Sequence, residues 1–143
     1  ERSGRAGGRA GGRAAEPWLA DILRESRANF GVAPPTFVQR AASEAWLDDA
    51  HVTERRQIFL AKRSLMLAHL RKLGLSVSGD GAFYLWVRVP AGDTSDSYAQ
   101  RLAERGILVT PGTFFGPSGT GFVRLSMVPT LADCQRAIDV WPA

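Results

Sequence analysis

Two adjoining stretches decide the fold of this chain: GILVTPGTFFG at residues 106–116 and GFVRLS at residues 121–126. The apolar run 107–109 predicts a strand, and the Pro, Gly and Ser residues beyond it predict a loop that holds two adjacent phenylalanines. The second stretch predicts another strand, with Arg124 at its centre and Val123 on the opposite face. The pattern allows two interpretations of Arg124. It is either a solvated arginine on a sheet edge, or a guanidinium held for a planar anion such as a carboxylate.

The composition is that of an ordinary soluble globular domain. The chain has 143 residues, of which 45% are hydrophobic and 22% are charged, so one domain with a real core is expected. No apolar run approaches the ~18 residues of a membrane span and no secretory leader is visible, which favours a cytoplasmic protein without membrane contacts. Cys134 is the single cysteine, so an internal disulfide is excluded. The two histidines, His51 and His69, are too few to assemble a metal-ligand cluster with it.

Positive charge is concentrated at the N-terminal end. Residues 1–13 contain four arginines and one glutamate, a net +3 of the formal +4, which leaves +1 for the other 130 residues. This nearly neutral body argues against a nucleic-acid groove. An Arg-Ala-Gly-Gly unit recurs within residues 1–15, and such a low-complexity segment is expected to be disordered. It is similar to an arginine-glycine RNA-binding tail, but it lacks the aromatic residues that stack on bases.

Helical periodicity dominates the first half of the chain. A first amphipathic helix is expected to end at Gly31, and the pair Pro34-Pro35 to open a second, small-residue helix. Asp48 or Asp49 should cap a long helix over about residues 50–73, a length that often connects two lobes.

Strand-like periodicity follows. We expect an edge strand near 75–77, a strand over 82–89, a helix capped by Ser95, and a last helix that begins with the capping-box pair Thr130 and Asp133. The inward residues of the last helix are predicted to be Leu131, Ile138 and Trp141. Helices followed by alternating strands and helices predict an α/β fold with a small, mostly antiparallel sheet.

Residue spacing alone predicts no catalytic constellation. His51 lies at a helix start and His69 inside the long helix, and both are interpreted as packing or solvated residues. Cys134 is expected in the core, and helix capping explains Asp48 and Asp49 better than paired-carboxylate catalysis. We therefore expect no catalytic residue and no metal site within this chain.

Six motifs nevertheless occur in a specific order. They are PPTFVQ at 34–39, WLDDAHV at 46–52, GAFYLW at 81–86, LAERGILVTPG at 102–112, FG at 115–116 and GFVRLS at 121–126. In order and spacing they resemble the C-terminal part of a class I/II (fold type I) pyridoxal-phosphate-dependent aminotransferase, most of all the succinyldiaminopimelate aminotransferases. The likeness covers roughly residues 16–142. It implies that residues 50–143 form the connecting helix and the small C-terminal domain, and that the helices of 16–49 are left over from the large domain.

The resemblance also implies site residues and partners. Arg124 would bind the α-carboxylate of the substrate, and pyridoxal 5'-phosphate would be the cofactor. The segment GGRAG at 7–11 matches the family's Gly-x-Arg-x-Gly motif, which makes Arg9 the residue that binds the cofactor phosphate; a low-complexity tail is the other interpretation. The complete enzyme would act on amino-acid and 2-oxo-acid substrates, N-succinyl-diaminopimelate among the candidates, and the family usually forms homodimers.

One requirement of the family is missing. Transamination needs a lysine that holds the cofactor covalently and then moves a proton, and the resemblance places Glu1 at that position. Lys62 and Lys72, the only lysines of the chain, match no such position. We therefore expect a C-terminal aminotransferase fragment that is inactive alone. An inactive remnant serving as an interaction module and an RNA-associated domain with a basic tail are the alternatives.

Overall fold

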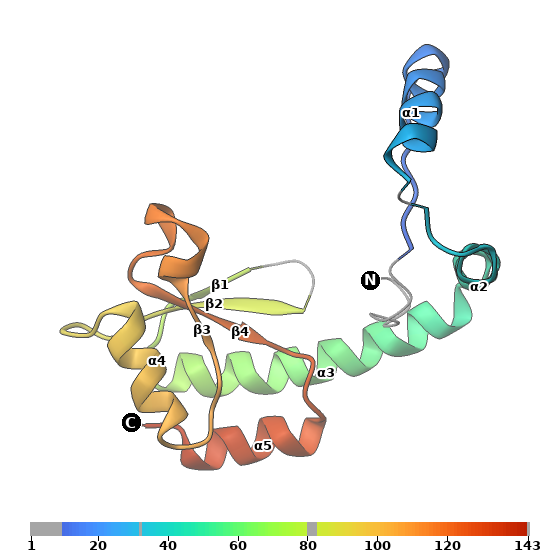
Figure 1. Ribbon diagram of the computed structural model, residues 1–143. Helices are drawn as coiled ribbons and strands as arrows, with labels where there is room; N and C mark the ends of the chain where they lie inside the picture. Colours follow the sequence, from blue (N-terminus) through green and yellow to red (C-terminus); the bar gives the residue numbers. More distant parts are fainter. Residues whose placement is uncertain (1–9, 32, 80–82, 143) are drawn as a thin grey trace. The chain divides into compact units, whose positions relative to one another are not determined.

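Three helices are followed by short strands and two further helices, in the order that the sequence predicts (Figure 1). The structure is a computed structural model that describes residues 10–31, 33–79 and 83–142. The helices are α1 (Pro17–Phe30), α2 (Thr36–Leu47), α3 (Ala50–Lys72), α4 (Ser95–Ala103) and α5 (Leu131–Val140). The strands are β1 (Val77–Ser78), β2 (Tyr84–Arg88), β3 (Thr110–Pro111) and β4 (Phe122–Ser126), and two 3₁₀ turns, η2 (Gly112–Phe115) and η3 (Pro117–Gly119), join β3 to β4. The chain divides into two compact units, which meet within α3 between residues 55 and 56.

The N-terminal unit contains α1, α2 and the start of α3. Gly31, at φ 63°, ends α1 in the left-handed conformation that glycine adopts without strain. Asp48 caps α3, because its Oδ1 accepts the backbone N–H of Ala50 at 2.9 Å and of His51 at 3.3 Å. These helix boundaries agree with the sequence-based prediction.

Neither α1 nor α2 buries a single residue. Large apolar side chains are left open on both helices; Phe30 is 76% exposed, Phe37 74% and Trp46 61%. An amphipathic helix of a globular protein normally buries its apolar stripe, so the described residues of the N-terminal unit do not by themselves supply a surface that covers these helices.

The second unit is built on an antiparallel sheet with the strand order β1-β2-β4-β3. Leu85 and Val87 of β2 and Val123 and Leu125 of β4 alternate onto one face and are buried. Helices α3 and α5 lie beneath the sheet in Figure 1. Residues of α3, α4 and α5 join those four in one core, which includes Met66, Leu70, Tyr98, Ala99, Leu102 and Cys134. The predicted α/β fold with a small antiparallel sheet is thus confirmed.

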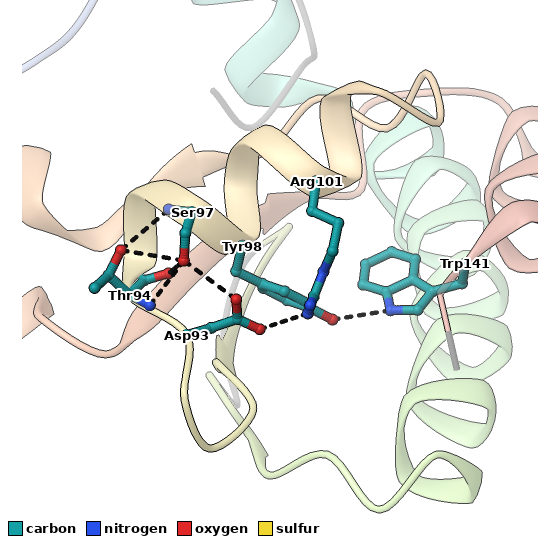
Figure 2. A network of polar contacts seen from close by, with 6 residues as sticks. All are labelled: Asp93, Thr94, Ser97, Tyr98, Arg101 and Trp141. Carbon is teal, nitrogen blue, oxygen red and sulfur yellow. Dashed lines mark hydrogen bonds and ion pairs between the residues drawn. The ribbon is translucent and has the colours of Figure 1, made fainter.

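Helix α4 is fixed at both ends by polar contacts (Figure 2). Thr94 and Ser97 form a reciprocal capping box, and Arg101 pairs with Asp93. On the same side of the helix as Arg101, whose guanidinium carbon lies 5.1 Å from the Tyr98 ring centre, Trp141 Nε1 donates to Tyr98 Oη at 3.1 Å in the buried core. Burial raises the pKa of the Tyr98 phenol, so it remains a neutral acceptor at physiological pH.

Three details of the prediction are wrong. The cap of α4 is Thr94 and not Ser95, because Ser95 is buried and its Oγ accepts the N–H of Gly121 at 3.0 Å. Residues 107–109 are not a strand, since the Ile107 N–H closes the last turn of α4 on Leu102 O at 3.0 Å and pairing with β4 starts only at Thr110.

The third wrong detail is the inward position predicted for Leu131 in α5. The capping box of Thr130 and Asp133 is confirmed, but Leu131 lies in the first turn of the helix and is 50% exposed.

The loop between β3 and β4 crosses over itself at two glycines. A Cβ added at Gly112 would lie 2.0 Å from the carbonyl oxygen of Gly119 and 2.6 Å from that of Phe122. No side chain fits between these backbone segments. The crossing fixes η2 and η3 against the sheet and therefore fixes Phe115, the last residue of η2.

We predict that Gly112→Ala lowers the free energy of unfolding by about 1–3 kcal/mol, the usual cost of overpacking, since rigid backbone surrounds the added methyl group. Urea denaturation followed by circular dichroism measures the change. Gly12→Ala is the matched control, because a Cβ there meets nothing within 4 Å. Equal midpoints for both variants would show that the crossing is not formed.

We also predict that Tyr98→Phe destabilises the fold by about 1–3 kcal/mol, because it leaves the buried Trp141 N–H without an acceptor. Tyr84→Phe is the control, because it also deletes a phenolic oxygen, but one that forms no hydrogen bond with the described residues. This variant should leave the unfolding midpoint nearly unchanged. A Tyr98→Phe variant as stable as Tyr84→Phe would contradict the hydrogen bond.

Candidate functional site

A row of side chains crosses the sheet on the face opposite the core. Ser78 pairs with Trp86, Trp86 pairs with Arg124, and Arg124 pairs with Thr110 in the antiparallel registers. Directly opposed residues in such pairs project to the same side. The row therefore places a guanidinium at the centre of a face that the helices of the core leave uncovered.

Arg124 is held between two aromatic rings. Its guanidinium carbon lies 4.1 Å from the ring centre of Tyr84 and 4.4 Å from that of Phe115. Both contacts are at cation–π distance, which stabilises the charge and fixes the plane of the guanidinium. Tyr84 comes from β2, two residues before Trp86, and Phe115 comes from the loop whose crossing is set by Gly112.

The side chain of Arg124 forms no hydrogen bond with the described residues. Its Nε is buried and has no partner, and no carboxylate forms an ion pair with it among the described residues. Stacking occupies the faces of a guanidinium and leaves its N–H edges free. Those edges form a planar fork that matches a carboxylate or a similar anion with two parallel hydrogen bonds.

A pocket of about 290 Å³ adjoins this arginine. Phe115 connects the two features, because its ring contacts Arg124 and also meets Trp86 edge-on at 5.2 Å between ring centres. The pocket is lined by Ser78, Trp86, Phe115, Ser118, Gly119 and Phe122.

The other residue that the sequence singles out as a binding residue, Arg9, lies outside the described residues. The two lysines do not approach the Arg124 face. Lys62 is only 4% exposed, and its Nζ donates to Pro129 O at 2.9 Å and lies 4.4 Å from the ring centre of Phe59. Lys72 is exposed in the last turn of α3. The described residues thus provide an anion site without an amine beside it.

The titratable residues interpreted as structural have structural surroundings. The His51 ring lies 3.0 Å from the Asp48 carboxylate, whose pKa is lowered mainly by the backbone N–H of His51. His69 packs edge-on against Trp141, and burial lowers its pKa. Burial also disfavours the charged form of the Cys134 thiol, and it therefore raises the pKa of that group.

No metal site and no membrane span occur in the described part of the chain. No three His, Cys, Asp or Glu side chains there come close enough together to hold an ion. Nor does any helix in residues 10–31, 33–79 and 83–142 have the length and apolar character needed to cross a bilayer.

Sequence reasoning singled out Arg124 and expected the loop of Phe114 and Phe115 near it, but it missed Tyr84 and the stacking of both rings on the guanidinium. Tyr84 and Phe115 are 40 and nine positions away, and only the register of β2 against β4 brings Tyr84 to the same face. The adjacent phenylalanines at 114 and 115 were the one available signal. The structure separates them, since Phe114 is 76% exposed and Phe115 covers the arginine.

Known proteins share the sequence pattern and the fold of this chain. The family model described as aminotransferase class I and II matches residues 2–140. The 4-dedimethylamino-4-oxo-anhydrotetracycline transaminase of Streptomyces rimosus is 36% identical over 131 residues, which are 91% of this chain and 36% of that protein. The LL-diaminopimelate aminotransferase of Oleidesulfovibrio alaskensis is 40% identical over 105 residues, which are 71% of this chain and 27% of that protein.

Solved structures show the same relationship. An aminotransferase from Neisseria meningitidis superimposes on 97% of this chain with a TM-score of 0.86 and 32% identity, and the match covers 37% of that structure. The aromatic aminotransferase of Pyrococcus horikoshii gives a TM-score of 0.78 at 30% identity over 89% of this chain and 36% of its own. The chain thus spans about a third of the length of the relatives that it matches. It belongs to the class I and II aminotransferases, a family that depends on pyridoxal phosphate.

Proposed function

We propose that this chain is the C-terminal part of an amino-acid transaminase and contributes the substrate-carboxylate side of its active site. In this proposal residues 50–143 are the connecting helix and the small domain, and the helices of 16–49 belong to the large domain. The open apolar side chains of α1 and α2 support that division, because helices with this pattern are stable only when a neighbouring surface covers the stripe.

The observation that carries the proposal is the unpaired guanidinium of Arg124. The α-carboxylate of an amino acid is planar and anionic, and two parallel hydrogen bonds from Arg124 would fix both its position and its plane. Fixing the carboxylate orients the Cα–H bond of the substrate for deprotonation. Tyr84 and Phe115 preorganise the guanidinium, so little conformational freedom is lost when the substrate binds.

Pyridoxal phosphate supplies the electron sink of the family's chemistry, but the described residues do not build its site. Lys62 is engaged with Pro129, and Lys72 is exposed on the far end of α3. We propose Arg9 as a contact of the cofactor phosphate on the strength of the GGRAG motif alone. The amine that carries the cofactor has to come from outside the described residues.

The complete enzyme, in this proposal, transfers an amino group between an amino acid and a 2-oxo acid in the cytoplasm, as a homodimer. N-succinyl-diaminopimelate is the candidate substrate that the sequence motifs suggest. The chain by itself binds a carboxylate but does not transaminate.

Replacing Arg124 tests the carboxylate site directly. We predict that Arg124→Gln weakens the binding of propanoate to the 143-residue chain by roughly tenfold or more, since both charge-assisted hydrogen bonds are lost. The shifts of backbone amide signals in nuclear magnetic resonance titrations measure the dissociation constant. Arg136→Gln is the matched control, because Arg136 is exposed on α5, where it pairs with Asp133, and it lines no part of the site. Equal affinities of the two variants would refute the assignment.

Cofactor chemistry gives a second prediction. Incubation of the chain with pyridoxal phosphate, borohydride reduction and peptide mapping should show no single preferred lysine, and no amino transfer should be detected. Stoichiometric labelling at Lys62 or Lys72, together with turnover, would contradict the proposed inactivity of the isolated chain.

The upstream DNA provides a third test. We predict that it encodes a lysine-bearing large domain, in the same reading frame or after a single frameshift. Sequencing that region decides the point. If no such domain is encoded, a remnant that acts as an interaction module becomes the better explanation of the open helices.

A further inference from the structure

The pocket beside Arg124 has a chemistry different from that of the arginine. Its walls are the rings of Trp86, Phe115 and Phe122, and its remaining lining is Gly119 and the hydroxyl-bearing Ser78 and Ser118. Among the described residues, no charged side chain lines it. Arg88, on the same face of β2 as Trp86, lies 5.3 Å from the ring centre of Phe122 and is not part of the lining.

The pocket and the arginine are parts of one surface. Ser78, Trp86 and Arg124 belong to the same cross-strand row, so the floor of the pocket continues into the anion site without an intervening strand. Phe115 contributes a wall to the pocket and one of the two rings that stack on Arg124. A molecule whose carboxylate lies on Arg124 therefore has this aromatic pocket within reach of its next few carbon atoms.

The geometry points to this pocket as the subsite that binds the side chain of the substrate. The part of that side chain inside the pocket would be apolar, either aromatic or aliphatic. This inference rests on the proposed function, because it takes the Arg124 carboxylate site as its anchor. Aromatic walls gain from contact with apolar groups, whereas a second carboxylate would lose water against a described lining that offers only rings, a glycine and two hydroxyl groups. The volume, about 290 Å³, is at the low end for small-molecule sites and suits a side chain and not a whole cofactor.

This chemistry selects among amino acids. Aspartate and glutamate carry a second carboxylate within one or two methylenes of Cα, which would bring it into the pocket. Side chains with a phenyl ring, or with an uninterrupted run of methylenes before any polar end, would fill the pocket without burying a charge. The trimethylene of N-succinyl-diaminopimelate meets this requirement, since its polar groups lie beyond that run.

Three carboxylates test the inference on the 143-residue chain: propanoate, 3-phenylpropanoate and pentanedioate. Titrations monitored by nuclear magnetic resonance give each dissociation constant. We expect 3-phenylpropanoate to bind at least about tenfold more tightly than propanoate, with amide shifts at Ser118 and Gly119, and we expect pentanedioate to gain nothing over propanoate. Tighter binding of pentanedioate, or equal binding of propanoate and 3-phenylpropanoate, would overturn the inference while leaving the carboxylate role of Arg124 intact.

A pocket-filling variant sharpens the test. Ser118 is exposed at the rim, so Ser118→Trp can fill the pocket without overpacking the core. The tenfold preference for 3-phenylpropanoate over propanoate should fall to about one in this variant. Ser64→Trp is the matched control, because Ser64 is exposed on α3 and is not part of the pocket lining, and it should retain the full preference. Retention of the preference in Ser118→Trp would place the phenyl group elsewhere and overturn the inference.

The Arg124→Gln variant distinguishes failure of the proposed carboxylate site from failure of the proposed side-chain pocket. If none of the three carboxylates binds this variant, the result supports Arg124 as the carboxylate site on which the pocket proposal depends. If 3-phenylpropanoate binds Arg124→Gln as tightly as it binds the unmodified chain, the proposed carboxylate site fails, and with it the claim that pocket and arginine form one subsite. The amide spectrum of each variant shows directly that the fold is retained.

Discussion

The pairing of β2 with β4 is the constraint on which the second unit depends. Five residue pairs in register put Leu85, Val87, Val123 and Leu125 on one face, where the helices bury them. The same alternation puts Arg124 on the other face, among aromatic rings. A shift of one residue would exchange the two sets, exposing the core and burying a charge. Both changes are costly, so the register is fixed, and the register in turn positions Arg124 and the rings around it. The stability of this unit and the proposed carboxylate site thus rest on one set of backbone hydrogen bonds.

The loop between β3 and β4 supplies the second ring that holds Arg124. The backbone segments of Gly112 and Gly119 cross at a distance that leaves no room for a Cβ, so any other residue at either position would force the loop to shift. Its compactness holds Phe115 over Arg124 and beside Trp86, where one ring serves both the cation and the pocket. Substrate selection, in the proposal made above, follows from a backbone contact and not from any charged residue of the loop.

The N-terminal unit presents the opposite situation. Its helices are well formed, with a left-handed glycine stop and an aspartate cap, yet they bury nothing. Helix signals are local, whereas burial requires a second surface, and the relatives that this chain matches are about three times as long. The proposed active site is likewise incomplete within this chain. Arg124 and its aromatic supports are complete within the second unit, while the described residues hold no amine for the cofactor, since Lys62 is committed to Pro129.

Arg124 was singled out by the resemblance of its GFVRLS motif to a known family, since the spacing alone left its role open. The sequence by itself determined the class of fold, most helix boundaries and the alternation of β4. All of these depend on interactions between residues a few positions apart: capping, helical and strand periodicity, and the stop at Gly31. Only the tertiary structure decided that Ser95 serves Gly121 instead of capping α4, that pairing begins at Thr110, and that Lys62 is buried. It alone brought Tyr84, Phe115 and Trp86 around Arg124. These outcomes depend on strand register and on a loop crossing, which join residues distant in the chain and leave no periodic trace in the sequence.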